Sequence, residues 1–208
     1  IIGMMLMVVF YLSFYEGLPG MPGGFLTTAH YTEIVKDELA FGVTSNNATF
    51  GQVRNAYDRA RFAGGSSGGN GAAIAARLAP AGIGTDTGGS VRIPAALNGI
   101  AGFRPTSGRY STDGVTPIST TRDSPGSMAR TVVDLVLLDS VITSAKDKVK
   151  AANLERVRIG VERAFFFSNV DTETAEFIER ALWRLRAAGV EIVEFEMPGF
   201  ADLVRKSA

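Results

Sequence analysis

Two glycine-rich segments, each with a serine beside a glycine pair, constrain this chain more than any other feature of its sequence. The first is GGSSGG at residues 64–69, and the second is GTDTGGS at residues 84–90. Glycine allows backbone conformations that other residues resist and brings N–H groups close to a ligand. We therefore expect the hydroxyls of Ser66 and Ser90 to be exposed beside amide donors, as a nucleophile that attacks a carbonyl carbon requires.

The base that would activate such a serine is not a nearby histidine, because the only histidine of the chain is His30, far upstream. Residues 64–69 also have two alternative interpretations. A flexible glycine-serine linker is one, although the matching segment at residues 84–90 argues against coincidence. A phosphate-binding loop is the other, and it is disfavoured because no Gly-Lys-Ser or Gly-Lys-Thr follows the glycines.

Composition limits the class of protein and its partners. The 208 residues carry 21 basic and 21 acidic side chains, and this balance does not suggest nucleic acid as a partner. Without cysteine the chain has no disulfide and no thiolate metal site, which fits a reducing compartment, so we expect a cytoplasmic protein. A hydrophobic content of 46% is enough for the core of one domain.

Residues 1–15 form an uncharged, strongly apolar run. The run is shorter than the ~20 residues that span a bilayer, so we expect no membrane partner. It also lacks the basic start and the small-residue cleavage site of a secretory signal. A buried strand or helix is the favoured interpretation, and a trimmed targeting segment or a piece that packs on an absent part of the chain are the alternatives. We treat residues 1–33 as an unplaced N-terminal segment.

The middle of the chain predicts short elements around the two serine segments. They are a helix over residues 70–78 that Pro80 ends, a buried strand over residues 81–85, and a short helix over residues 94–97. Residues 102–128 are rich in Gly, Pro, Ser and Thr, so we expect ordered loops over a site. A helix capped by Thr131 follows over residues 131–142.

The C-terminal part has the pattern of a β-α-β unit. Residues 157–161 predict a strand, Asp171 begins a helix with one apolar face, and residues 190–195 predict a second strand. Such a unit implies two parallel strands joined by a right-handed crossover, so the fold class is α/β. Residues 144–155 before it predict a solvated hinge. Phe165–Phe167 are interpreted as packing residues, with the wall of an aryl pocket as the alternative.

The two serine segments, together with Gly102–Thr106 (GFRPT), resemble the amidase signature family. Its signature is GGSSGG, then GTD-x-GGS-x-R-x-P, which Gly84–Pro94 matches, and then G-x-(K/R)-P-T. The resemblance extends from about Glu38 to Met197. It implies an amidase-signature fold with a mixed β-sheet core flanked by helices. Residues 34–208 would then be a partial amidase signature domain, incomplete at both ends.

The resemblance also implies a catalytic triad of two serines and a lysine. Ser90 corresponds to the nucleophile, and Ser66 to a bridging serine whose peptide bond to the preceding residue is cis in the family. The lysine of the family lies in a Lys-Asp segment, which Lys36 and Asp37 resemble. Lys36 is also the only lysine that precedes the two serines. We therefore predict Lys36 as the base, with a solvated surface lysine as the alternative.

The predicted oxyanion hole lies in the turn that carries the nucleophile. Its donors would be the backbone N–H groups of Thr87, Gly88, Gly89 and Ser90. Asp86 and Arg92 are interpreted as structural residues that brace this turn by hydrogen bonds. The resemblance implies no cofactor and no metal.

Within the family, the chain is most similar to amidases of arylacetamides such as mandelamide and indoleacetamide. The implied activity is hydrolysis of a small aryl carboxamide to a carboxylic acid and ammonia, with homo-oligomer formation left open. One alternative is a glutamyl-tRNA amidotransferase A-like subunit, which usually has glutamine where this chain has Ile93. The other is a catalytically incomplete fragment, because the family places several dozen residues between its Lys-Asp segment and the position of Glu38.

Overall fold

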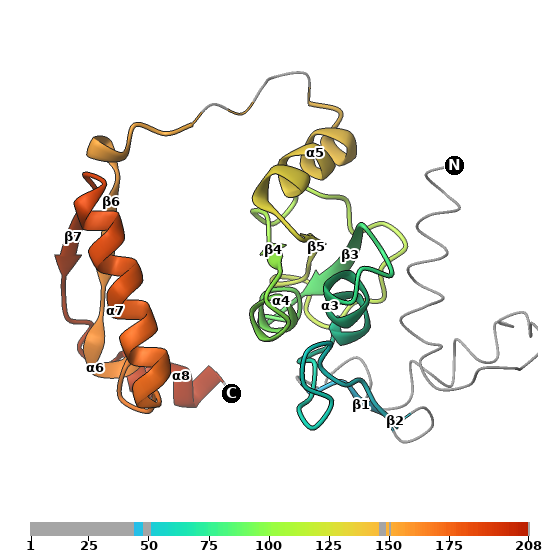
Figure 1. Cartoon of the computed structure of the whole chain (residues 1–208), viewed down its shortest axis with the longest axis horizontal. Helices are drawn as coiled ribbons and strands as arrows, with labels where there is room; N and C mark the ends of the chain where they lie inside the picture. Colours follow the sequence, from blue (N-terminus) through green and yellow to red (C-terminus); the bar gives the residue numbers. More distant parts are fainter. Residues whose placement is uncertain (1–43, 48–50, 146–148, 150, 208) are drawn as a thin grey trace, which may run out of the picture. The chain divides into compact units, whose positions relative to one another are not determined.

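The computed structural model of the protein describes residues 44–47, 51–145, 149 and 151–207. The N-terminal segment 1–33 with His30, and the Lys36-Asp37 segment, lie outside the described residues. The chain divides between residues 147 and 148 into two compact units, and this boundary falls inside the segment predicted as a hinge (Figure 1). Each unit is described by itself.

The first unit contains two small sheets and three described helices. In chain order its elements are β1 (Asn46–Asn47), β2 (Gly51–Gln52), α3 (Gly68–Ala75), β3 (Ala81–Asp86), α4 (Arg92–Leu97), β4 (Ala101–Phe103), β5 (Ser124–Ala129) and α5 (Val132–Thr143). β1 and β2 form an antiparallel pair. The predicted strand after Pro80 and the predicted short helix after the second serine segment are confirmed as β3 and α4.

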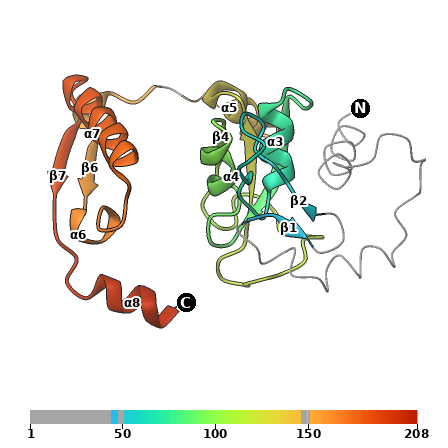
Figure 2. The same ribbon diagram turned by 60° about the horizontal axis from the view of Figure 1, so that its bottom comes forward.

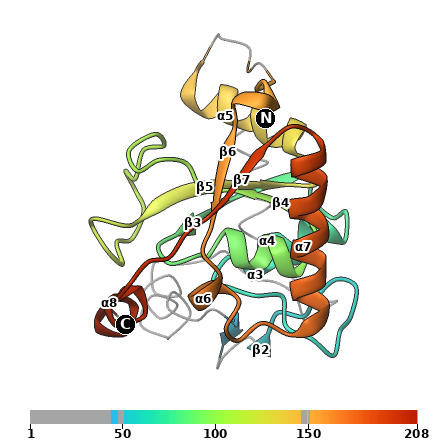
Figure 3. The same cartoon turned by 90° about the vertical axis from the view of Figure 1, so that its left-hand side faces the viewer.

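The larger sheet of this unit has the order β3-β5-β4 and is antiparallel throughout. β5 pairs with β3 along its whole length, from Ser124 opposite Asp86 to Ala129 opposite Ala81. β4 pairs only with the second half of β5, beginning at Phe103 opposite Ser127. Figures 1 and 3 place the sheet between α5 on one side and α3 with α4 on the other. β3, which leads into the second serine segment, is therefore an edge strand of this sheet.

Apolar side chains from the helices and the central strand form the core of the first unit. Its members are Ile74, Ala79, Val91, Ala95 and Met128, with Ile100 packed against them. All eight residues of α3 are buried, and none is larger than Ile74. Small residues allow this close approach, since a Cβ on Gly71 would lie 3.1 Å from the carbonyl oxygen of Pro94 in α4. Glycine and alanine therefore allow α3, which begins inside the first serine segment, to pack closely against α4.

The structure corrects the prediction of loops over residues 102–128 at its two ends. Residues 102–103 belong to β4, and residues 124–129 form the central and fully buried strand β5, whereas residues 104–123 contain no helix or strand, as predicted. The Ser-Pro-Gly-Ser composition is typical of a turn, but this strand needs small side chains. A Cβ on Gly126 would lie 2.5 Å from the carbonyl oxygen of Phe103. Pro125 lies opposite Thr85, at a register position that β4 does not reach, so its missing N–H group removes no hydrogen bond to β4.

The second unit contains the predicted β-α-β arrangement. β6 (Arg158–Val161) and β7 (Glu191–Glu194) are parallel, and α7 (Thr172–Ala187) lies between them in the chain and packs against β7 (Figures 1 and 2). Asp171 accepts a hydrogen bond from the Thr174 N–H group at the start of α7, and Gly189 follows its end with φ of 99°. The remaining elements are η2 (Leu154–Arg156), α6 (Arg163–Phe166) and α8 (Phe200–Ser207).

The first unit has helices and antiparallel strands, and the second has helices and a parallel strand pair. The predicted α/β class with mixed strand pairing is therefore confirmed. The cap of α5 is also confirmed, because the Thr131 side chain accepts a hydrogen bond from the Asp134 N–H group. In the described ranges, every helix is too short or too polar to cross a membrane.

Candidate active site

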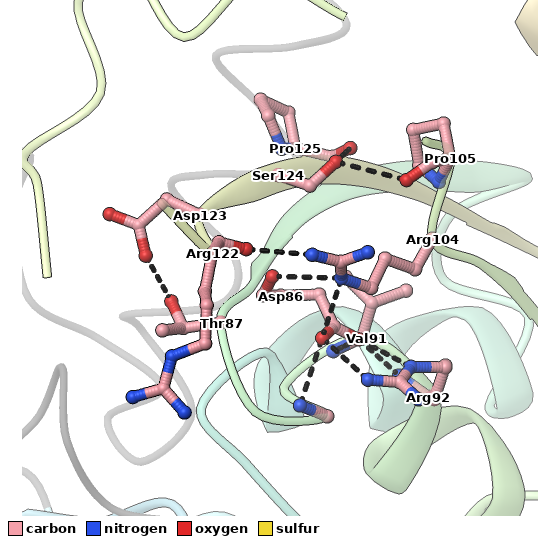
Figure 4. A network of polar contacts seen from close by, with 11 residues as sticks. Asp86, Thr87, Val91, Arg92, Arg104, Pro105, Arg122, Asp123, Ser124 and Pro125 are labelled. Atoms are coloured by element: carbon pink, nitrogen blue, oxygen red, sulfur yellow. Dashed lines mark hydrogen bonds and ion pairs between the residues drawn. The ribbon is translucent and has the colours of Figure 1, made fainter. Parts of the chain in front are cut away.

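The turn that carries Ser90 runs from the end of β3 to the start of α4 and is held by one buried carboxylate. The side chain of Asp86 is fully buried. Its oxygens accept hydrogen bonds from the N–H groups of Gly89 at 2.8 Å and Val91 at 3.3 Å (Figure 4). These two residues flank Ser90 on both sides. The carboxylate therefore fixes the backbone on either side of the predicted nucleophile.

Two arginines neutralise this buried carboxylate. Arg92 donates from Nε to Oδ2 and from Nη2 to Oδ1 of Asp86, each at 3.0 Å. Arg104 Nε lies 3.3 Å from the Asp86 carbonyl oxygen, to which it donates, and 3.4 Å from Oδ1. Burial raises the pKa of Asp86, but the hydrogen bonds from Arg92 and the Val91 N–H group outweigh it, so the net pKa lies below the ordinary value of 3.8. The prediction that Asp86 and Arg92 brace the turn is confirmed.

Thr87 connects the same turn to the loop that precedes β5. Its hydroxyl donates a hydrogen bond to Oδ1 of Asp123. The other oxygen of Asp123 accepts hydrogen bonds from the N–H groups of Ile118 at 2.7 Å and Ser119 at 2.9 Å. Burial raises the pKa of Asp123, yet these hydrogen bonds, led by that from Thr87, bring it below the ordinary value. An ionised carboxylate thus joins the loop to the turn.

The first serine segment lies directly against the second. The peptide bond between Gly65 and Ser66 is cis, as the family resemblance implies. The N–H group of Ser67 donates a hydrogen bond to the carbonyl oxygen of Ser90 at 3.1 Å. A Cβ on Gly84 in β3 would lie 2.3 Å from Ser67 Oγ, so this position allows the segment to approach the strand. The two serine segments, separate in the sequence, are therefore neighbours in the fold.

The structure brings together two members of the predicted triad at the level of the backbone. Ser66 and Ser90 are both half-buried, on segments joined by the hydrogen bond between Ser67 and Ser90. Lys36 lies outside the described residues, so its role as base stays a prediction.

The predicted oxyanion donors differ in their surroundings. The Gly89 N–H group already donates to Asp86, whereas those of Gly88 and Ser90 form no hydrogen bond within the described part of the chain. Gly88 is also exposed, and a Cβ built there would meet nothing within 4 Å. Gly89 is therefore a weaker candidate donor than Gly88 and Ser90.

Arg104 and Asp123 belong to the site, and sequence reasoning assigned neither of them a role. Arg104 Nη2 donates to the Arg122 carbonyl oxygen at 2.7 Å, while its Nε reaches Asp86 (Figure 4). The only signal for them was the family resemblance of the segments that contain them. Among the residues that the structure describes, no group of three or more His, Cys, Asp or Glu side chains could hold a metal ion.

Phe165 and Phe166 pack against other aromatic rings, in line with the packing role favoured for residues 165–167, but none of the three residues is buried and Phe166 is 54% exposed. Phe165 and Phe166 contact each other, and both contact Phe200, with ring centroids 5.0 and 5.6 Å from it. Arg163 lies over the ring of Phe167. These residues all belong to the second unit.

Comparison with known proteins defines the class to which this fold and this arrangement of serines belong. Residues 33–208 match the family model described as Amidase, and the chain belongs to this family. It is 48% identical to an indoleacetamide hydrolase of Allorhizobium ampelinum over 169 residues, which cover 81% of this chain and 36% of the relative. It is 50% identical to a mandelamide hydrolase of Pseudomonas putida over 166 residues, which cover 77% of this chain and 32% of the relative.

Solved structures agree with the family assignment. A crystal structure described as an amidase matches with a TM-score of 0.73 and 32% sequence identity, over 93% of this chain and 46% of that structure. The chain spans about a third of the length of the two curated relatives.

Proposed function

We propose that the protein hydrolyses a small aryl carboxamide to a carboxylic acid and ammonia, with Ser90 as nucleophile, Ser66 as proton relay and Lys36 as base. The observation that carries this proposal is the hydrogen bond between the Ser67 N–H group and the Ser90 carbonyl oxygen. This hydrogen bond holds the backbones of the two serine segments next to each other. A proton relay between the Ser66 and Ser90 hydroxyls requires that the two segments be close. The names of the two curated relatives support an aryl carboxamide as the substrate.

In the first step the proton of the Ser90 hydroxyl passes to Ser66, whose own proton passes to neutral Lys36. Ser90 Oγ forms a bond to the amide carbon, and the carbonyl electrons move to the oxygen, giving a tetrahedral oxyanion. A free lysine has a pKa of about 10.4, so desolvation or a nearby cation must lower it for this role. Placement of Lys36 beside Ser66, away from bulk water, is therefore part of the proposal.

The oxyanion requires donors that are in place before the reaction starts. We assign this role to N–H groups of the turn Thr87–Ser90, and the unengaged groups of Gly88 and Ser90 are the best candidates. Because Asp86 holds the residues on both sides of Ser90, the turn needs little reorganisation. Loss of one such donor in other serine hydrolases lowers kcat by about 10²–10³-fold.

The tetrahedral species collapses when its C–N bond breaks. The proton on Lys36 returns through Ser66 to the leaving nitrogen, so that ammonia departs and Ser90 remains acylated. A water molecule then attacks the ester carbon, and the same relay accepts its proton. The bond between the acyl carbon and Ser90 Oγ then breaks, and the relay returns the proton to Ser90 Oγ, so that the carboxylic acid leaves and the free hydroxyl is regenerated.

Ammonia release from indoleacetamide and mandelamide tests this proposal. We expect turnover by the wild-type protein, and a loss of roughly 10²-fold or more in kcat for Ser66→Ala and for Lys36→Ala. Ser168→Ala, which removes an exposed hydroxyl in the second unit, serves as the matched control and should keep wild-type kcat. Release of ammonia at the wild-type rate by Ser66→Ala would refute the proposed relay.

A further inference from the structure

A small pocket lies in the loop between β4 and β5, outside the serine segments. Its volume is about 190 Å³, and it is lined by Thr112, Val115, Pro117, Thr120 and Asp123. Backbone hydrogen bonds hold its walls, since the Val115 N–H group donates to the Thr112 carbonyl at 3.0 Å and the Asp123 N–H group donates to the Ser119 carbonyl at 2.9 Å. The loop that lines the pocket is therefore held by its own backbone hydrogen bonds.

The loop that forms the pocket is tied to the turn of Ser90 at two points. Asp123, which lines the pocket, accepts a hydrogen bond from the hydroxyl of Thr87, three residues before Ser90. One residue earlier, the Arg122 carbonyl accepts a hydrogen bond from Arg104, which also donates to Asp86. Figure 4 shows both connections side by side. A group held in this pocket would thus have a fixed position relative to the predicted nucleophile.

The lining residues indicate what the pocket can hold. Sites for drug-sized ligands have volumes of about 300–1,000 Å³, so this pocket fits only a small group. Val115 and Pro117 offer apolar surface, and Thr112 and Thr120 offer hydroxyls. The oxygens of Asp123 are already engaged by Thr87 and two backbone N–H groups, and its negative charge disfavours an anion. An uncharged ring fits these conditions best.

We infer that the pocket of Thr112, Val115, Pro117, Thr120 and Asp123 is the subsite for the uncharged ring on the acyl side of the carboxamide. This inference rests on the proposed function, to which it adds the place where the substrate is recognised. Val115 then acts as a specificity-determining residue. The two connections to the Ser90 turn would hold the ring on a loop that is fixed to that turn.

Binding of phenylacetamide to the full chain, followed by NMR titration, tests the inference independently of turnover. Val115→Phe places a ring inside the pocket, and we expect it to weaken phenylacetamide binding roughly tenfold or more. Val132→Phe is the matched control, because Val132 is 68% exposed on α5 and does not line the pocket; it should bind as the wild type does. If Val115→Phe does not fold, Thr120→Phe replaces it, since Thr120 is exposed.

The outcomes separate this inference from the proposed function. Equal affinity of the wild type and a folded pocket variant, or no binding of phenylacetamide to the wild type, would overturn the subsite. Binding that Val115→Phe weakens, in a wild-type protein that releases no ammonia, would instead refute the proposed function and retain the pocket as a binding site for an uncharged ring.

Discussion

Asp86 and Arg92 form a two-point ion pair, with Nε–Oδ2 and Nη2–Oδ1 distances of 3.0 Å each, across the turn that carries Ser90. The carboxylate is fully buried, whereas the Arg92 side chain is 56% exposed. Charge-assisted hydrogen bonds of this kind are about twice as strong as neutral ones. The pair therefore fixes the two ends of the turn, the last residue of β3 and the first of α4, and Ser90 lies between them.

Replacement of Asp86 by asparagine should destabilise the fold. The amide group of Asp86→Asn cannot accept from Gly89, Val91 and Arg92 at the same time, and hydrogen bonds to charged groups contribute about 1.5–3 kcal/mol. We expect the free energy of unfolding in urea at neutral pH to fall by about 2–3 kcal/mol. Asp58→Asn is the control. Asp58 pairs with Arg61 on the surface, so this substitution should change the free energy of unfolding by less than about 0.5 kcal/mol. Equal changes in the two variants would contradict this role of Asp86.

The same carboxylate makes stability depend on pH in acid. The net pKa of Asp86 lies below 3.8 in the folded protein, because the hydrogen bonds it accepts outweigh the effect of burial. A group with a depressed folded pKa stabilises the fold above its unfolded pKa, and this contribution is lost as the pH falls through the folded pKa. The difference in unfolding free energy between the wild type and Asp86→Asn should thus be constant above pH ~5 and shrink below pH ~3.8. Urea unfolding at a series of pH values measures this difference in unfolding free energy. A difference that grows in acid would contradict a depressed pKa of Asp86 in the folded protein.

Gly126 should not tolerate a side chain. A Cβ there would lie 2.5 Å from the carbonyl oxygen of Phe103, and the central strand cannot move without disturbing its neighbours on both sides. We expect Gly126→Ala to lower the free energy of unfolding by about 1–3 kcal/mol, the usual range for overpacking. Gly88→Ala is the matched control for stability, since nothing lies within 4 Å of a Cβ at that position. A Gly126→Ala protein as stable as Gly88→Ala would show that the strands separate readily.

Local patterns in the sequence predicted most elements of the fold. The caps at Thr131 and Asp171 have short-range signals, and α5 and α7 begin where these signals place them. The helix predicted over residues 70–78 instead spans Gly68–Ala75. It begins inside the glycine cluster, where Gly68 leaves room for Ser45, whose Oγ would lie 2.2 Å from a Cβ at this position. Glycine is a weak helix former on its own, so this start has no local signal.

The same patterns could not predict β5 or the connections of the site. The residues of β5 have turn composition, and their burial in a strand follows from contacts with β3 and β4 that no local signal encodes. The serine segments could be predicted because each is short and contiguous. By contrast, Thr87 and Asp123 are 36 residues apart in the sequence, and only the folded chain brings them together.

The most direct test of the account is the intact mass of the folded protein after incubation with a fluorophosphonate, which reacts with activated serines. We predict a single adduct on the wild type and on Ser168→Ala, and none on Ser90→Ala, because activation of one hydroxyl requires the relay that the proposal assigns to Ser66 and Lys36. A folded wild-type protein without an adduct, or an adduct that persists in Ser90→Ala, would contradict the assignment of Ser90 as the nucleophile.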